Sequence, residues 1–190
     1  MTDQWLIVGL GNPGPTYSTT RHNVGYMVAE VLAGRMGGSW KAHKSGRADL
    51  VEGQLAGIKA VVARPRSYMN ESGGPVAGLA QYYKVEPDHL IVVHDELDID
   101  FGALRTKFGG GDNGHNGLKS IRQSLGTGDY YRVRVGLGRP PGRQNTADFV
   151  LKSYTPIERR DLPTYVEEAA DAVESLMQHG LEATQSAYNR

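Results

Sequence analysis

The sequence predicts an α/β fold, with residues 1–190 as a single domain built on a mixed, partly parallel twisted sheet with helices on both faces. Three observations lead to this prediction. The length of 190 residues suits one domain. A composition of 39% hydrophobic and 22% charged residues is typical of a folded chain. Short apolar runs of strand length alternate with segments of helical period, as in α/β proteins.

The first half of the chain predicts a strand, a helix and a hairpin. Residues 5–10 form an almost continuous apolar run typical of a buried strand, and the Gly/Pro-rich residues 11–15 end it. Apolar residues at helical spacing follow and stop at about Gly34. Residues 46–53 and 57–64 flank a short turn, which indicates an antiparallel hairpin.

The second half continues the alternation. Residues 90–94 form a strongly apolar run that predicts a central strand. Apolar residues between Leu162 and Met177 recur with the period of a long amphipathic helix. The remaining elements expected here are helices over about 72–83 and 115–125 and strands over 103–108 and 131–137.

Composition and charge exclude several function classes. The chain has no cysteine, which excludes disulfides, thiol catalysis and cysteine-based metal sites. No apolar run approaches a membrane span and no basic leader precedes the first strand, so a cytoplasmic protein without a membrane partner is expected. The net charge is zero, but residues 101–145 carry 8 basic and 2 acidic residues, a net +6. This basic segment is either the place where a polyanion binds or a solvated basic face.

A glycine motif follows the first strand. Residues 9–14 match G-x-G-x-x-G, which would suggest an NAD-dependent oxidoreductase. Pro13 and Pro15 remove two N–H donors that a pyrophosphate needs, and the helical pattern begins only near Arg21. The favoured interpretation is a tight loop that projects Asn12 from the carboxyl end of a central strand, where open α/β sheets place their sites.

His22 and Asp95 are expected at the same sheet edge. His22 opens the first helix, and Asp95 follows the second buried strand. A carboxylate at that position can orient an imidazole and stabilise its protonated form, so the pair suits general base catalysis. The structural alternatives are a surface histidine and an aspartate that caps nearby backbone. The acidic run 95–100 does not fit an EF-hand and no G-x-S-x-G elbow is present, so neither a metal nor a serine nucleophile is expected.

A glycine-rich loop over residues 109–117 lies within the basic segment. It lacks the Gly-Lys-Ser/Thr of a P-loop, and its flexibility suits a lid or a close approach to a chain-like ligand. Tyr68 and Met69 offer an apolar wall. Three carboxamides, which donate and accept without charge and so suit a peptide backbone, are expected to border one base: Asn12, Asn70 and Asn116.

Taken together, these motifs resemble the bacterial peptidyl-tRNA hydrolase family. The resemblance runs through the whole chain, and its most specific pieces are residues 17–25, 68–70, 93–98 and 114–121. It implies a single-domain, usually monomeric α/β enzyme without a cofactor. Such an enzyme cleaves the ester that joins a peptide to tRNA, so peptidyl-tRNA is the expected partner and free tRNA returns to translation.

The resemblance also implies roles for individual residues. His22 matches the general base, Asp95 the carboxylate that supports it, and Asn12 the residue that distinguishes blocked from free aminoacyl-tRNA. The matching substrate contacts are Tyr17, Tyr68, Asn70 and Asn116, with Met69 lining the site. Lys107 and Arg134, from neighbouring expected strands, match the groups that meet tRNA phosphates.

One position departs from the family pattern, and one alternative function stays open. The family usually has glycine where this chain has Asn113, a residue type that tolerates left-handed backbone. The alternative is a non-catalytic RNA-binding relative with the same fold. The combination of His22, Asp95 and Asn12 with Asn70 favours catalysis, because RNA binding alone needs no buried base.

Overall fold

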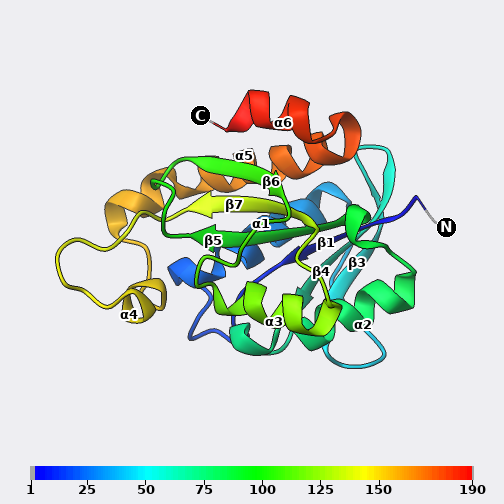
Figure 1. Cartoon of the computed structure of the whole chain (residues 1–190), viewed down its shortest axis with the longest axis horizontal. Helices are drawn as coiled ribbons and strands as arrows, with labels where there is room; N and C mark the ends of the chain where they lie inside the picture. The colour runs from blue at the N-terminus through cyan, green and yellow to red at the C-terminus, as the bar shows by residue number, and fades with distance from the viewer. Residues whose placement is uncertain (1–2, 190) are drawn as a thin grey trace.

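The computed structural model describes residues 3–189, which form a seven-stranded sheet between two layers of helices (Figure 1). The strand order is β2-β3-β4-β1-β5-β7-β6. The four inner strands run parallel: β4 (Ile58–Pro65), β1 (Trp5–Gly9), β5 (Leu90–Glu96) and β7 (Tyr131–Gly136). The outer strands are antiparallel to their neighbours: β2 (Lys41–Ala42), β3 (Ala48–Leu55) and β6 (Leu104–Phe108). The predicted α/β class with a partly parallel sheet is confirmed.

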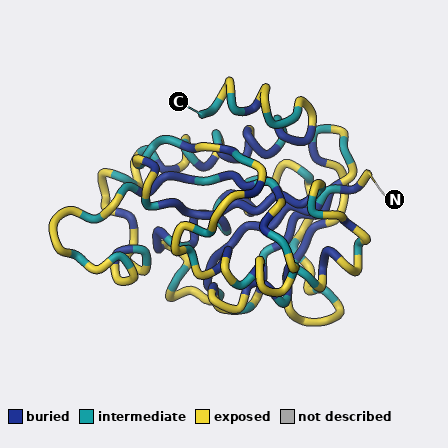
Figure 2. Tube along the Cα trace, viewed as in Figure 1, coloured by how far each residue is buried: buried dark blue, intermediate teal, exposed yellow. Residues whose placement is uncertain are grey.

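Side chains alternate across the strands and build a core on each face. In β1, Ile7 faces the core that includes α1 (Val24–Arg35) and α5 (Pro156–His179). Its neighbours Leu6 and Val8 face the opposite core, which includes α2 (Gly73–Tyr83) and α3 (Asn116–Leu125). Figure 1 shows α2 and α3 on one side of the sheet and α5 on the other, and Figure 2 shows the buried strands between them.

Within residues 3–189, one strand and two α-helices were not expected from the sequence. They are β2, α4 (Thr146–Val150) and α6 (Leu181–Tyr188). The elements β2 and α4 are too short to show a period. Helix α6 is stabilised by contact with the edge strand β6: Asn189, directly after α6, accepts the N–H of Thr106 in β6 on its Oδ1 at 2.8 Å. The first helix also begins later than predicted, because residues 21–23 form a 3₁₀ turn before α1.

Two glycines let α1 approach the carboxyl ends of β1 and β5. A Cβ on Gly25 would lie 2.5 Å from backbone atoms of Leu10 and Val93, and a Cβ on Gly9 would collide with the Gly25 carbonyl. Only glycine permits packing this close. The approach carries His22, which stands just before α1, to the end of β5.

None of the helices within residues 3–189 is both long and apolar enough to cross a membrane.

Candidate active site

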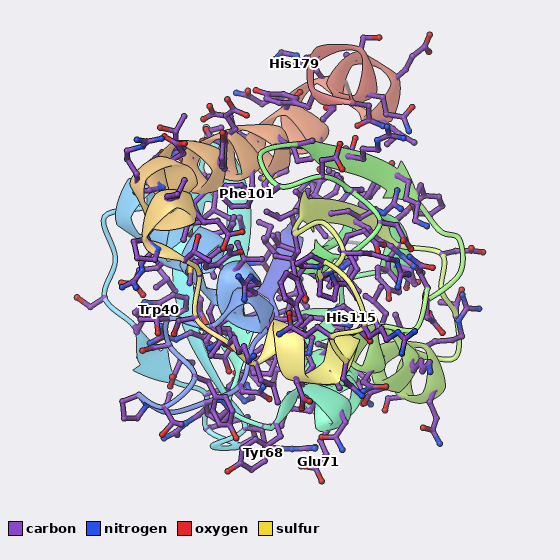
Figure 3. The ribbon with its side chains drawn as sticks, turned by 90° about the vertical axis from the view of Figure 1, so that its left-hand side faces the viewer. Trp40, Tyr68, Glu71, Phe101, His115 and His179 are labelled. Atoms are coloured by element: carbon purple, nitrogen blue, oxygen red, sulfur yellow. The ribbon has the colours of Figure 1, made fainter. Side chains whose placement is uncertain are left out.

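The candidate site lies at the carboxyl ends of β1 and β5, the edge where open α/β sheets bind ligands. Figure 3 looks at this end of the molecule, with His115 near the middle of the view and Tyr68 at its lower edge. Asp95, the next-to-last residue of β5, is at the centre of the site.

The Asp95 carboxylate is shared by two imidazoles. Its Oδ2 lies 2.7 Å from Nδ1 of His22, and its Oδ1 lies 2.8 Å from Nε2 of His115. The side chain is only 3% exposed, and this burial by itself raises the pKa of Asp95. The two imidazoles outweigh burial and hold the pKa well below its usual range. An ionised carboxylate only accepts hydrogen bonds, so both ring nitrogens carry the protons.

Of the three imidazoles at this end of β5, His22 alone has a ring nitrogen open to a substrate. His115 uses its second nitrogen, Nδ1, to accept the Leu118 N–H at 3.3 Å and so caps α3. His94 is buried, donates from Nδ1 to the Asp95 carbonyl at 2.8 Å, and has its pKa lowered well below the ordinary value by burial. His22 Nε2 has no partner among residues 3–189, and the side chain is 12% exposed.

The pKa of His22 lies above the ordinary value of 6.5. Burial lowers this pKa, but the charge of Asp95 and the hydrogen bond to it raise the pKa by more. An imidazole whose Nδ1–H is held by a carboxylate can take a proton on Nε2, and the carboxylate stabilises the imidazolium that forms. These are the properties of a general base.

Asn12 is held so that only its amide NH₂ faces the site. Its backbone N–H donates to Oδ1 of Asn23 at 2.9 Å, and Asn23 Nδ2 donates to the Asn12 carbonyl at 2.9 Å. Its side-chain Oδ1 accepts the Met69 N–H at 2.7 Å. The side-chain oxygen is therefore occupied, and the amide hydrogens remain as donors for a ligand.

The other residues predicted to contact substrate lie next to Met69 or His115 in the chain, or pair with a residue that does. Met69 is buried beside Asn12, and Tyr17 and Tyr68 form an edge-to-face pair with ring centroids 6.3 Å apart. Tyr68 is 54% exposed, which leaves its ring available to a ligand. Asn70 and Asn116 are exposed and directly follow Met69 and His115 in the chain.

Lys107 and Arg134 lie apart from this centre, on β6 and β7. Lys107 is opposite Arg132, and Arg134 is opposite Arg105, so all four side chains project from one face of the strand pair. Burial lowers the pKa of Lys107, and the positive charges of Arg134 and Arg132 lower it further. Glu96 compensates this cluster in part, with Oε1 3.5 Å from Arg134 Nη2. The expected placement of Lys107 and Arg134 on one surface is therefore found.

Comparison with known proteins identifies the family. The profile of the family described as "Peptidyl-tRNA hydrolase" matches residues 6–190. The chain belongs to the peptidyl-tRNA hydrolase family. Its similarity to the peptidyl-tRNA hydrolase of Frankia casuarinae is 62% identity over 185 residues, covering 97% of this chain and 93% of the relative. The Rhodococcus erythropolis peptidyl-tRNA hydrolase is 60% identical, with 97% of each protein covered.

A solved structure agrees with this assignment. The crystal structure of peptidyl-tRNA hydrolase from Acinetobacter baumannii superposes with a TM-score of 0.90 at 33% identity, covering 99% of this chain and 97% of that one. The predicted family and the predicted class of enzyme, a hydrolase, are confirmed.

Two residues of this hydrolase site were not assigned from the sequence. His115 was seen only as part of the glycine-rich loop, and Asn23 only as the residue after His22. Their partners are 20 and 11 residues away in the chain, so no local pattern indicates either contact. The available signal for Asn23 was its position directly after the candidate base His22. This pattern indicates a particular contact only when the fold is known.

The side chains of His22, Asp95 and His115 also have the composition of a metal site, with one ligand atom from each within 4.8 Å of the others. The sequence predicted no metal here. Both carboxylate oxygens of Asp95 already accept hydrogen bonds within the cluster, one from His22 Nδ1 and one from His115 Nε2. The arrangement is complete as a hydrogen-bonded triad.

A buried arginine fixes the glycine loop of this peptidyl-tRNA hydrolase site. Arg132 is fully buried and donates to the carbonyls of Gly111 at 2.6 Å, Gly110 at 3.1 Å and Gly128 at 2.9 Å. Its guanidinium also lies 4.7 Å from the ring centroid of Tyr130. The first half of the loop is therefore held from beneath by charge-assisted hydrogen bonds.

We expect Arg132→Met to lower the free energy of unfolding by at least about 3 kcal/mol, because each charge-assisted hydrogen bond contributes about 1.5–3 kcal/mol and three carbonyls would be left without this donor. Urea denaturation followed by circular dichroism measures the change. The matched control is Arg105→Met, an exposed arginine on the neighbouring strand, which should change stability by less than about 0.5 kcal/mol. Equal losses of stability in the two variants would contradict this role.

Proposed function

We propose that this chain hydrolyses the ester between peptide and tRNA with His22 as general base, Asp95 as its supporting carboxylate and Asn12 as the donor to the oxyanion. The observation that carries the proposal is the 2.7 Å contact between His22 Nδ1 and Asp95 Oδ2, which leaves Nε2 of a histidine with a raised pKa open to the site. Asn12, Met69 and the Tyr17–Tyr68 pair border the same space.

The reaction follows from these positions. His22 Nε2 takes a proton from a water molecule while the water oxygen attacks the ester carbonyl, and the negative charge passes to the carbonyl oxygen. The Asn12 amide donates a hydrogen bond to that oxygen. When the tetrahedral intermediate collapses, the bond to the ribose oxygen breaks and the His22 imidazolium returns its proton to that oxygen. The products are free tRNA and a peptide with a carboxyl terminus.

The carboxamides give the selectivity in this proposal. Asn12, Asn70 and Asn116 can donate to and accept from a peptide backbone without adding charge. A blocked α-nitrogen is a neutral amide, whereas the free amino group of aminoacyl-tRNA is cationic near neutral pH. Asn12 thereby distinguishes blocked from free aminoacyl-tRNA, with Tyr17 and Tyr68 against the substrate and Met69 lining the site.

We further propose that residues 1–190 act in the cytoplasm as a monomeric single domain, without a cofactor or metal. The tRNA lies over Lys107 and Arg134, since these cations project from one face, where Glu96 offsets them only in part. The alternative, an RNA-binding protein without activity, is disfavoured by the presence of an oriented base, which binding does not require.

The test of the proposed function is the release of free tRNA from an N-acetyl-aminoacyl-tRNA, measured beside the same tRNA with a free amino group. We expect turnover of the blocked substrate and little of the free one. Binding of both tRNAs without release of amino acid from either would favour the alternative.

The pH dependence should report the His22–Asp95 pair. His22 must be neutral to accept a proton, so kcat/KM rises with pH through the pKa of His22, which Asp95 raises above 6.5. In Asp95→Asn the charge of Asp95 is gone while burial still lowers the pKa, so the limb moves to lower pH and the maximum rate falls. A pH series with N-acetyl-aminoacyl-tRNA, corrected for spontaneous ester hydrolysis, measures both. A limb that stays in place would show that another group takes the proton.

The salt dependence should report the cationic face. For Lys107→Ala/Arg134→Ala we expect weaker tRNA binding and a slope of log K against log salt reduced by about 0.7–0.9 for each phosphate that the protein no longer neutralises. Lys107→Ala alone should turn over a short blocked aminoacyl-oligonucleotide almost as the wild type does, since it leaves both the ester site and the contact between Arg134 and Glu96 intact. Arg143→Ala, an exposed residue in the same basic segment, is the control. Identical slopes in all three proteins would make this face an ordinary solvated surface.

A further inference from the structure

The second half of the glycine loop contains a residue in an unusual backbone conformation. Asn113 has φ +48°, between the positive-φ glycines Gly110 and Gly114. Asparagine enters this left-handed region more readily than most residues but less readily than glycine. The hydrogen bonds of its side chain therefore indicate which interactions asparagine adds here that glycine could not make.

The side chain of Asn113 ties the loop to the end of β5. Its Nδ2 donates to Oε2 of Glu96 at 2.8 Å and to Oδ2 of Asp98 at 2.6 Å. Both hydrogens of the amide are thus used, and both acceptors are carboxylates, which makes the bonds charge-assisted. The loop's first half is already fixed by Arg132.

The two carboxylates are themselves held by cations. Arg139 binds Asp98 through two contacts, Nε to Oδ1 at 2.6 Å and Nη2 to Oδ2 at 3.1 Å. Arg134 lies 3.5 Å from Glu96 Oε1, leaving Oε2 for Asn113. A neutral donor fits between the two carboxylates, whereas a third carboxylate would be repelled.

The attachment continues directly into the proposed catalytic triad. Glu96 follows Asp95 in β5, and His115 is two residues beyond Asn113. The loop therefore meets β5 at two successive points, Asn113 on Glu96 and His115 on Asp95. A loop released at Asn113 has one anchor less to keep His115 Nε2 at 2.8 Å from the carboxylate.

We propose that Asn113 is a positioning residue, which holds the glycine loop against the end of β5 so that His115 reaches Asp95 and Asn116 faces the substrate. This inference rests on the proposed function for its catalytic consequence but not for the attachment itself.

Two substitutions at this position separate the hydrogen bonds from the backbone conformation. Asn113→Gly keeps the positive φ without strain and removes both bonds, and we expect kcat to fall by about 3- to 30-fold, the effect of one or two hydrogen bonds. Asn113→Asp sets a third carboxylate against Glu96 and Asp98, and we expect a larger decrease than for glycine. In both variants the amides of residues 109–118 should exchange hydrogen faster than in the wild type.

In the double variant Asn113→Asp/Asp98→Asn the amide and the carboxylate exchange positions, so a hydrogen bond between residues 113 and 98 can form again. This variant should recover part of the kcat that Asn113→Asp removes. Asp98→Asn alone is the control. A positioning role also predicts a shifted pH profile, because Asp95 with a weakened bond to His115 interacts more strongly with His22 and moves the limb of kcat/KM to higher pH. A merely structural role would leave that limb in place.

Hydrogen exchange keeps this inference distinct from the proposed function. If His22→Ala were fully active, the catalytic proposal would fail, while faster loop exchange in Asn113→Gly would still show the attachment. Unchanged exchange in both Asn113 variants, or equal kcat for Asn113→Gly and Asn113→Asp without recovery in the double variant, would overturn the inference. Urea midpoints close to wild type confirm that the variants fold.

Discussion

Replacing His22 with alanine should lower kcat for N-acetyl-aminoacyl-tRNA by about 10²–10⁴-fold, the usual contribution of a general base. The reason is geometric, because neither other imidazole at this end of β5 can take over. His115 uses both ring nitrogens, and the free nitrogen of His94 is buried. KM should change little, since the carboxamides and the cationic face that we propose bind substrate are untouched.

The matched control is His179→Ala, an exposed histidine at the end of α5 that lies far from His115 in Figure 3. It should retain full activity. Added imidazole should restore part of the rate of His22→Ala, because a small diffusible base can occupy the space that the side chain leaves. Near-normal turnover by His22→Ala without imidazole would remove His22 from the mechanism.

Local pattern was sufficient to predict most of the fold. The apolar runs at residues 5–10 and 90–94 overlap the inner strands β1 and β5. They could be recognised because a strand covered on both faces needs apolar residues throughout. The short elements β2 and α4 lie below the length at which a period can be recognised. The order of the strands across the sheet is set by packing between distant segments, which no window of sequence contains.

The site was predictable to the extent that its residues stand at element boundaries. His22 precedes and Asp95 follows a recognisable apolar segment, so their common edge could be inferred from the rule for open α/β sheets. The sharing of Asp95 between His22 and His115 could not be inferred, since it depends on a loop that returns from β6 to the end of β5. The direction of the Asn12 side chain could not be predicted for the same reason, because it is fixed by hydrogen bonds with Asn23 and Met69, which are distant in the sequence.

The second large expected effect is the loss of kcat in Asn12→Asp, and it follows from the orientation of the Asn12 side chain. Asn12→Asp keeps an oxygen that accepts the Met69 N–H, so the loop should keep its conformation, but it replaces the free amide donor with a second carboxylate oxygen. The developing oxyanion would then have one hydrogen bond fewer and meet a negative charge. Removal of one such donor costs about 2.7–4 kcal/mol, so kcat should fall by at least about 10²-fold.

The same substitution should narrow the discrimination between blocked and free aminoacyl-tRNA. A carboxylate beside the α-nitrogen attracts a cationic amino group, which the neutral amide of Asn12 does not, so the ratio of kcat/KM for the two substrates should approach one. Asn23→Ala is the structural comparison: it frees the Asn12 backbone, and it should lower both the urea midpoint and kcat while leaving the ratio close to wild type. If Asn12→Asp retains kcat within a few-fold and an unchanged ratio, the oxyanion is stabilised elsewhere and the α-nitrogen is recognised by another of the three carboxamides.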